Sequence, residues 1–211
     1  LARGGGTHSD RSMRMMGTVL YEISKDLIKQ AKPVAAHLLQ ADESAIDFSD
    51  GKFRIEETGQ ETDMQAVAAA YAEFSGKDAP LMSEYFQEGR IKAYPYGASA
   101  AEIEIDPETG DMTIERYGIV DDCGQAVNPM IVHGQTHGGI VQGAGQAMGE
   151  CAFFDLGSGQ LLTGSFMDYM MPRADQFPMF DIGTMEVPST TNPLRIKAGG
   201  EAGTVPALAV I

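Results

Sequence analysis

The chain has 211 residues, of which 43% are hydrophobic and 21% charged, so a globular fold with a sizeable core is expected rather than disorder. Acidic residues outnumber basic ones by 30 to 15, and the formal net charge of −15 argues against nucleic-acid and anionic-membrane surfaces, which attract clustered Lys and Arg. The two cysteines, Cys123 and Cys151, are too few for a disulfide scaffold or an iron–sulfur cluster. We expect both to be small buried side chains of a cytoplasmic protein.

The first half of the chain predicts helices around one hairpin. Residues 12–40 show apolar positions at helical spacing, and Pro33 is expected to break or kink this stretch into two helices. Residues 44–57 alternate around Ser49-Asp50-Gly51, which predicts a hairpin. Residues 62–74 form a short Ala-rich helix with Asp63 early in its first turn.

The second half begins with the clearest hairpin in the sequence. Residues 98–105 and 112–120 both alternate, and a turn at 106–110 joins them. Asn128 is the predicted N-cap, with Pro129 as the first residue, of a Gly-rich helix that runs to about Glu150. Short strands are expected at 152–154 and 180–187. Because strands and helices interleave without a regular βαβ repeat, we predict an α+β fold.

Both ends of the sequence have the character of internal segments. The chain starts within a Gly-rich loop without an initiating Met, and it stops at Ile211 within an apolar run. We therefore expect residues 1–211 to be one part, the C-terminal part, of a domain in a longer subunit.

The predicted helix after Asn128 carries two features that could serve chemistry. His133 and His137 have the i, i+4 spacing of zinc ligands, but Gly134 replaces the base of the zinc-protease motif, and hydrogen-bonded histidines are the competing interpretation. Six glycines also fall between positions 134 and 149, where each costs about 1 kcal/mol relative to Ala. Either another helix packs very closely on them or a large ligand lies against bare backbone, and glutamines such as Gln142 could hydrogen-bond a heterocycle.

Two further segments are candidates for a site. Residues 4–12 form a Gly-rich loop that leads into a helix, where backbone N–H groups together with Ser9, Arg11 and Ser12 could bind an anion. Glu201 is a single carboxylate among small residues before an apolar run. It could be a general base with a pKa raised by burial, or a helix N-terminal Glu stabilised by the helix dipole.

Four ordered motifs resemble the large subunit of molybdenum hydroxylases, the xanthine dehydrogenase, aldehyde oxidase and aerobic carbon monoxide dehydrogenase family. They lie at residues 116–129, 134–146, 162–174 and 192–201. The resemblance covers nearly the whole chain, least so between residues 40 and 94. Arg195 is a departure, because Gly is common at that position in the family.

The resemblance implies a molybdopterin-binding domain and gives roles to individual residues. Glu201 falls at the family's catalytic glutamate and would act as the general base. Gln142 would hydrogen-bond the pterin, and Gly199 and Gly200 would bring the backbone close to the metal centre, which is held by the pterin dithiolene and by no side chain. The expected cofactor-binding residues are Ser9, Arg11, Ser12, Gln142, Gly143, Lys197, Gly199 and Gly200.

The resemblance also implies what the intact protein does. It would use molybdenum-molybdopterin cytosine dinucleotide to oxidise an aldehyde, an N-heterocycle or carbon monoxide with oxygen from water. Partner subunits would carry a 2Fe-2S cluster and FAD, in a dimer of heterotrimers. The alternative is an inactive binding module that lacks the cofactor.

Overall fold

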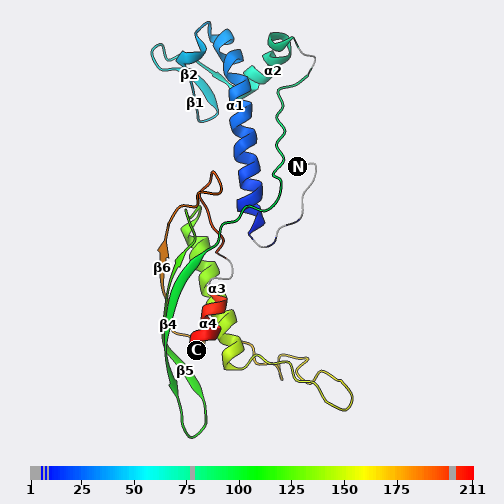
Figure 1. Cartoon of the computed structure of the whole chain (residues 1–211), viewed down its shortest axis with the longest axis vertical. Helices are drawn as coiled ribbons and strands as arrows, with labels where there is room; N and C mark the ends of the chain where they lie inside the picture. The colour runs from blue at the N-terminus through cyan, green and yellow to red at the C-terminus, as the bar shows by residue number, and fades with distance from the viewer. Residues whose placement is uncertain (1–5, 7, 9, 77–78, 200–202) are drawn as a thin grey trace. The chain divides into compact units, whose positions relative to one another are not determined.

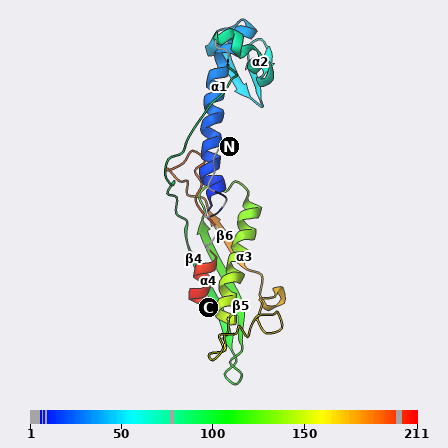
Figure 2. The ribbon, with the colours of Figure 1, turned by 90° about the vertical axis from the view of Figure 1, so that its right-hand side faces the viewer.

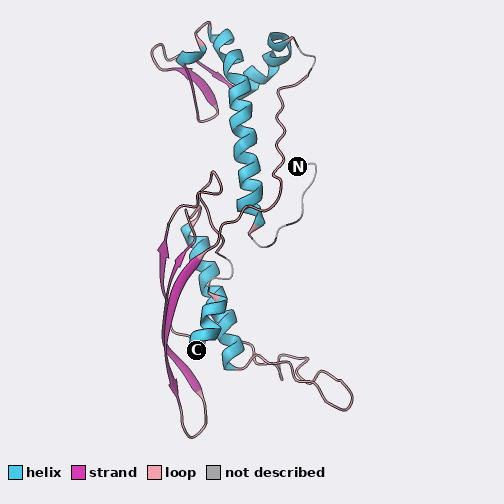
Figure 3. Ribbon diagram, viewed as in Figure 1, coloured by secondary structure: helices cyan, strands magenta, loops and turns pink. Residues whose placement is uncertain are grey.

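The computed structural model describes residues 6, 8, 10–76, 79–199 and 203–211, and the chain divides into two compact units. One unit is Met15–Arg90, and the other combines Leu1–Arg14 with Ile91–Ile211. Both units mix helices and strands (Figure 3), which confirms the predicted α+β class. None of the described helices is long and apolar enough to cross a membrane.

The unit Met15–Arg90 packs one long helix against a three-stranded sheet (Figure 1). Its elements, after the π-helical turn η1 (Ser12–Met16), are α1 (Gly17–Leu39), the 3-10 turn η2 (Glu43–Ala45), β1 (Ile46–Ser49), β2 (Lys52–Ile55), β3 (Glu61–Asp63) and α2 (Met64–Ser75). The predicted hairpin is confirmed, since β1 and β2 pair antiparallel across Asp50-Gly51, both with positive φ. Asp63 is the N-cap of α2 and accepts a hydrogen bond from the Ala66 N–H at 2.7 Å.

The predicted division of the first helix at Pro33 is wrong, because α1 continues through Pro33 to Leu39. Proline removes one backbone hydrogen bond there. The residues that follow it, Val34 and Ala35, are fully buried in the core, so burial after Pro33 offsets that loss. The rest of this core comes from the sheet and α2: Ile46, Phe53, Ile55 and Val67. Strand β3 was not predicted, since a three-residue strand has no readable alternation.

The other unit is built on a second three-stranded sheet in the order β4-β5-β6. Its elements are β4 (Tyr96–Ile105), β5 (Met112–Asp122), α3 (Pro129–Met148), the 3-10 turn η3 (Ala174–Gln176), β6 (Asp181–Met185) and α4 (Thr204–Val210). The predicted hairpin is confirmed as the antiparallel pair β4–β5, and β6 pairs parallel with β5 after the crossover through α3.

Helices α3 and α4 lie side by side on one face of this sheet (Figures 1 and 2). The core beneath them combines residues of β5, α3 and α4 with the residue that precedes β6: Ile114, Tyr117, Ile119, Ile140, Ala144, Phe180 and Ala207. The Tyr117 and Phe180 rings pack edge to face with centroids 5.7 Å apart. This core holds α3 and α4 against β5.

Two local predictions fail in the segment between α3 and β6. The expected strand at 152–154 is reduced to one isolated bridge between Phe154 and Leu161, because residues 151–160 are all exposed and have no sheet to join. Cys151 lies in this segment and is exposed, whereas Cys123 is buried as predicted. The expected strand at 180–187 is present but shorter, as β6.

Candidate functional site

Helix α3 presents two chemically different faces. Asn128 accepts a hydrogen bond from the Ile131 N–H at 3.3 Å and Pro129 occupies the first turn, which confirms the predicted start. The buried face carries small and apolar residues packed on the sheet and on α4: Thr136, Gly139, Ile140, Gly143 and Ala144. The exposed face carries Gln135, Gly138, Gln142 and Gln146 at helical spacing.

The glycines of the buried face bring α3 and the start of α4 into backbone contact. A Cβ on Gly143 would lie 2.2 Å from the Thr204 carbonyl oxygen and 2.9 Å from the Ala207 Cβ. A Cβ on Gly139 would lie 3.3 Å from the Gly203 Cα. At these positions close helix packing, one of the two predicted alternatives, explains the glycines. The expectation that Gly143 binds cofactor stays a prediction.

The exposed face of α3 fits the other alternative. A Cβ on Gly134 or Gly138 would meet nothing within 4 Å, so no packing in the described structure requires glycine there. The Gln142 side chain is exposed and makes no hydrogen bond to a described residue. A free amide beside bare backbone offers donors and acceptors for a flat polar ligand.

A buried ion pair ties the segment before α4 to the end of β5. The Lys197 ammonium lies 2.5 Å from Asp122 Oδ2 and 4.8 Å from the Tyr96 ring centroid. The Asp122 side chain is fully buried, and its Oδ1 accepts hydrogen bonds from the backbone N–H groups of Gly124 (2.8 Å) and Val187 (3.2 Å). Lys197, predicted to bind cofactor, therefore has a structural partner 75 positions away.

The electrostatics of Asp122 follow from these contacts. Burial opposes its charged form, but the hydrogen bonds from Lys197, the Gly124 N–H and Tyr96, with the charge of Lys197, hold the pKa of Asp122 below its ordinary value. The carboxylate therefore stays ionised at neutral pH and keeps the ammonium of Lys197 in place.

Backbone contacts reinforce this attachment. The Lys197 N–H donates to the Cys123 carbonyl at 2.8 Å, and Ile196 forms a bridge with Gly124. The Asn192 side chain closes the turn before them, donating to the Ile196 carbonyl and accepting from the Ile196 N–H. Residues 192–197 are thus held at the end of β5, next to Gly199, whose Cβ position would be 3.9 Å from the Cys123 Cβ.

The Ala93 carbonyl brings the N-terminal segment close to residue 198. It accepts from the Arg14 side chain at 3.3 Å and from the Ala198 N–H at 3.4 Å. Arg11 and Ser12, both half-buried, lie one turn before Arg14 at the start of the helical region. Ser9, Gly200 and Glu201 are outside the described residues. The predicted phosphate-binding and catalytic segments therefore approach each other at their described ends.

Asp121 is a buried acid that sequence reasoning missed. Its side chain is only 8% exposed, it lies against Gly97 of β4, and its Oδ2 has no hydrogen-bond partner. Burial raises the pKa of Asp121, in contrast to its neighbour Asp122. In the sequence Asp121 and Asp122 are two adjacent acids that cannot be distinguished, because only the fold shows that Asp122 is the one paired with Lys197.

The two histidines of α3 behave as hydrogen-bonded side chains. His133 Nε2 lies 3.2 Å from Thr184 Oγ1, and His137 Nδ1 donates to the His133 carbonyl at 2.9 Å. Among the described residues no three His, Cys, Asp or Glu side chains are grouped to hold a metal ion. These contacts favour the hydrogen-bonding interpretation over a zinc site.

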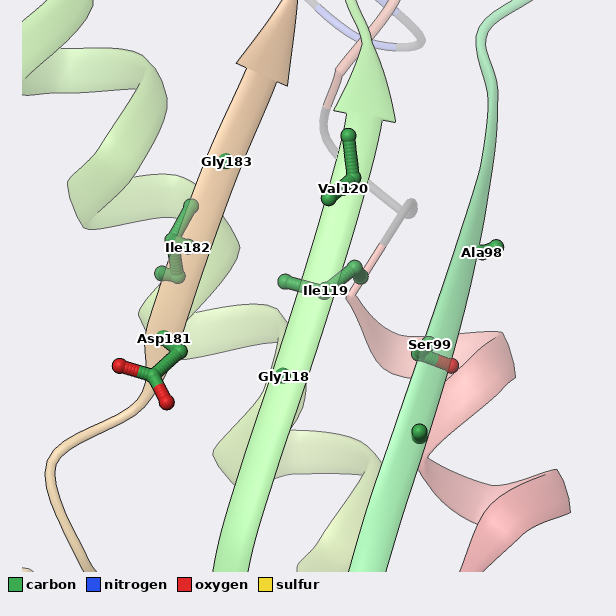
Figure 4. Close-up of a pocket in the computed structure, with 9 residues that line it drawn as sticks. Ala98, Ser99, Gly118, Ile119, Val120, Asp181, Ile182 and Gly183 are labelled. Carbon is green, nitrogen blue, oxygen red and sulfur yellow. The ribbon is translucent and has the colours of Figure 1, made fainter.

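A shallow depression on the β4-β5-β6 sheet lies apart from these residues. Figure 4 shows it lined by residues of the three strands, several of them small, such as Ala98, Gly118 and Gly183. None of the predicted site residues lines it. The candidate site is therefore the region of α3, residues 196–199 and the start of α4.

Comparison with known proteins decides the family. The model of the molybdopterin cofactor-binding domain matches residues 1–178. The chain belongs to this family. The matched residues include α3 with its glycines and the end of β5. The resemblance seen in the sequence motifs is therefore confirmed.

Relatives of this chain include a subunit of one dehydrogenase complex and the large chain of another dehydrogenase. It is 32% identical to the 6-hydroxypseudooxynicotine dehydrogenase complex subunit gamma of Paenarthrobacter nicotinovorans, over 99% of this chain and 27% of the relative. It is 29% identical to the carbon monoxide dehydrogenase large chain of Hydrogenophaga pseudoflava, over 96% of this chain and 26% of the relative. The chain thus spans about a quarter of the length of these relatives.

Solved structures give the same fold. The reconstituted CO dehydrogenase from Oligotropha carboxidovorans superposes with a TM-score of 0.79 at 28% identity, over 96% of this chain and 26% of that one. The quinoline 2-oxidoreductase from Pseudomonas putida 86 superposes with a TM-score of 0.78 at 32% identity, over 98% and 27%. The fold is therefore that of the molybdopterin-binding domain of molybdenum-dependent oxidoreductases.

Proposed function

We propose that this chain forms part of a molybdenum hydroxylase that oxidises an aldehyde, an N-heterocycle or carbon monoxide with oxygen derived from water. Glu201 is the proposed general base. The family match and the relatives, whose names include a carbon monoxide dehydrogenase and a quinoline oxidoreductase, support this reaction class.

The observation that carries the proposal is the exposed face of α3. Gln142 offers an unengaged amide there, and the backbone beside it is bare at Gly138. This donor set fits the edge of a pterin, which needs both donors and acceptors. Gln142 would hold the pterin, the glycines at 199 and 200 would allow close approach, and Arg11, Ser9 and Ser12 would bind phosphate oxygens.

When bound, the molybdenum cofactor supplies the two-electron redox centre. The residues of this chain supply orientation and proton transfer. The Glu201 carboxylate would accept the proton of the attacking water-derived oxygen. General base catalysis of this kind contributes about 10²- to 10⁴-fold in rate.

The cofactor form and the partners belong to the same proposal. We expect molybdenum-molybdopterin cytosine dinucleotide, with electrons leaving through a 2Fe-2S subunit to an FAD subunit in a cytoplasmic dimer of heterotrimers. The relatives' names support an assembly, since they describe a complex subunit and a large chain.

The test is Glu201→Gln in the complete enzyme that contains this chain. Turnover should fall by about 10²-fold or more while the molybdenum content stays normal. The control is Glu104→Gln, at an exposed position on β4. Unchanged turnover of Glu201→Gln refutes the base assignment, and native mass spectrometry without a cofactor-sized mass supports the inactive-module alternative.

A further inference from the structure

We propose that residues 151–171, between α3 and η3, form a docking arm whose apolar side chains pack against a part of the same polypeptide that lies outside residues 1–211. Docking of this arm is independent of the role proposed for Glu201. It would make the arm an attachment between this chain and the rest of the subunit.

The docking arm exposes apolar side chains that a solvent-facing loop rarely carries. None of its residues is buried, and Figure 1 shows it, in yellow, extending away from the end of α3. Its three Phe side chains, with exposed fractions of 60%, 56% and 81%, present on the order of 400 Å² to solvent, since an aromatic residue carries about 150–250 Å². An apolar area of that order on a protein surface marks an interaction site. The exposed large apolar side chains of the arm are Phe153, Phe154, Leu156, Leu161, Leu162, Phe166, Met167 and Met171.

The acidic groups of the docking arm are satisfied within it. Asp155 is the only charged residue between positions 151 and 167, and it accepts hydrogen bonds from the Gly157 N–H (3.2 Å), the Ser158 N–H (2.7 Å) and the Ser158 hydroxyl (2.6 Å). Asp168 accepts from the Ser165 hydroxyl at 2.8 Å. The surface on offer is therefore apolar. Its partner surface must be apolar as well, because a charged surface would lose water there without compensation.

The docking arm has a defined shape in the absence of a partner. Its strand-like ends are paired, since the Leu162 N–H donates to the Phe153 carbonyl at 2.8 Å. Its base is held on the end of α3, where the Tyr169 hydroxyl donates to Glu150 Oε1 at 3.0 Å. A surface that is already ordered loses less conformational entropy when it binds. This order favours a binding surface over a loop without a partner.

Chain length and charge identify the occupant. The chain matches 99% and 96% of itself to two relatives but spans only 27% and 26% of their lengths, so in those proteins the matched region belongs to a much longer polypeptide. A surface in the same polypeptide is present beside every arm, and covalent linkage raises its effective concentration to the order of 1 mM. A second copy is the less favourable occupant, because two chains with a formal charge of −15 repel each other.

The experiment places the photo-crosslinking residue benzoylphenylalanine at position 166 in the complete subunit that contains this chain. Illumination should join position 166 to a residue of the same polypeptide outside residues 1–211, with unchanged subunit mass on a denaturing gel and a crosslinked peptide pair in mass spectrometry. The control is the same residue at Glu108, which is exposed in the turn between β4 and β5, where we expect little crosslinking to protein. A crosslink from position 166 to a second copy, to another subunit or within residues 1–211 overturns the proposal, as does the lack of any crosslink.

Oxidation of Met167 by hydrogen peroxide tests the same contact without a substitution, and it decides if the crosslinking variant fails to fold. The Met167 side chain is 92% exposed in the chain described here. If the rest of the subunit covers the arm, Met167 should be oxidised about 10-fold more slowly in the native complete subunit than in the subunit unfolded in urea. Equal rates in the two states overturn the proposal. Neither readout uses turnover, so a negative result here leaves the role of Glu201 to be decided by Glu201→Gln alone.

Discussion

Replacing Lys197 with Met should destabilise the unit that contains Asp122. The substitution leaves a carboxylate that is fully buried without its counter-charge, while Lys197 itself is 12% exposed. Breaking a buried ion pair on one side costs about 3–5 kcal/mol, and the two backbone N–H donors that remain on Asp122 place the expected loss near the lower end, about 3 kcal/mol. For a protein of this size that corresponds to roughly 6–12 °C in Tm.

The assay is thermal unfolding combined with hydrogen exchange. Exchange at the Gly124 and Val187 amides, both bonded to Asp122, should rise because the unpaired carboxylate loses its fixed position. Lys92→Met is the matched control, since Lys92 is an exposed lysine of the same unit. Asp122→Asn in the Lys197→Met background removes the buried charge and should recover part of the loss.

The pH dependence gives a second check on the same pair. The folded pKa of Asp122 is lowered below 3.8, so its stabilisation is present above that pH and is lost as the pH falls through the folded pKa. The difference in stability between the native chain and Lys197→Met should therefore narrow in acid below about pH 4. A Lys197→Met protein with native Tm and native exchange would show that the ammonium does not stabilise Asp122 and would refute the reasoning.

Three further substitutions test local features. Arg195→Gly should stabilise by about 1 kcal/mol in urea unfolding, because Arg195 has φ +60°, a conformation that costs a side chain energy. Asn128→Ala should cost about 1 kcal/mol and raise hydrogen exchange in the first turn of α3. Asp121→Asn should become more stable relative to the native chain as the pH rises from 4 to 8. Burial raises the pKa of Asp121 in the folded state, so the native chain loses stability as this carboxyl ionises, whereas the Asn variant does not.

Local signals in the sequence predicted the hairpins and the start of α3 correctly. The turn Asp50-Gly51 requires positive φ at both residues, which few other pairs tolerate, and it appears where predicted. Asn128 followed by Pro129 likewise specified a helix start by side-chain chemistry alone. These features depend on residues adjacent in the sequence, so the sequence alone is enough to predict them.

Features that depend on residues far apart in the sequence could not be predicted from the sequence. Pro33 has the same local cost in any helix, and only the burial of Val34 and Ala35 against a later sheet shows why α1 continues. Lys197 and Asp122 are 75 positions apart, so their ion pair has no signature in spacing. The parallel pairing of β6 with β5 is equally non-local. Tertiary packing determines each of these outcomes.

The candidate site was predicted through family motifs more than through local chemistry. Motif order identified the family, and it marked Arg195 as unusual. The structure explains why Gly is common at position 195, because the backbone there takes a left-handed conformation that favours glycine. Motif order alone could not divide the glycines of α3 between packing and ligand contact.

The structure separates the glycines of α3 that pack against α4 from those that are exposed. Gly139 and Gly143 are required by the backbone of α4, so their presence needs no ligand. Gly134 and Gly138 have open space at their Cβ positions, and each still costs about 1 kcal/mol of helix stability relative to Ala. Nothing packed against them in the described chain accounts for that cost. This bare surface next to the free amide of Gln142 is the basis for proposing that a pterin approaches the backbone of α3 there.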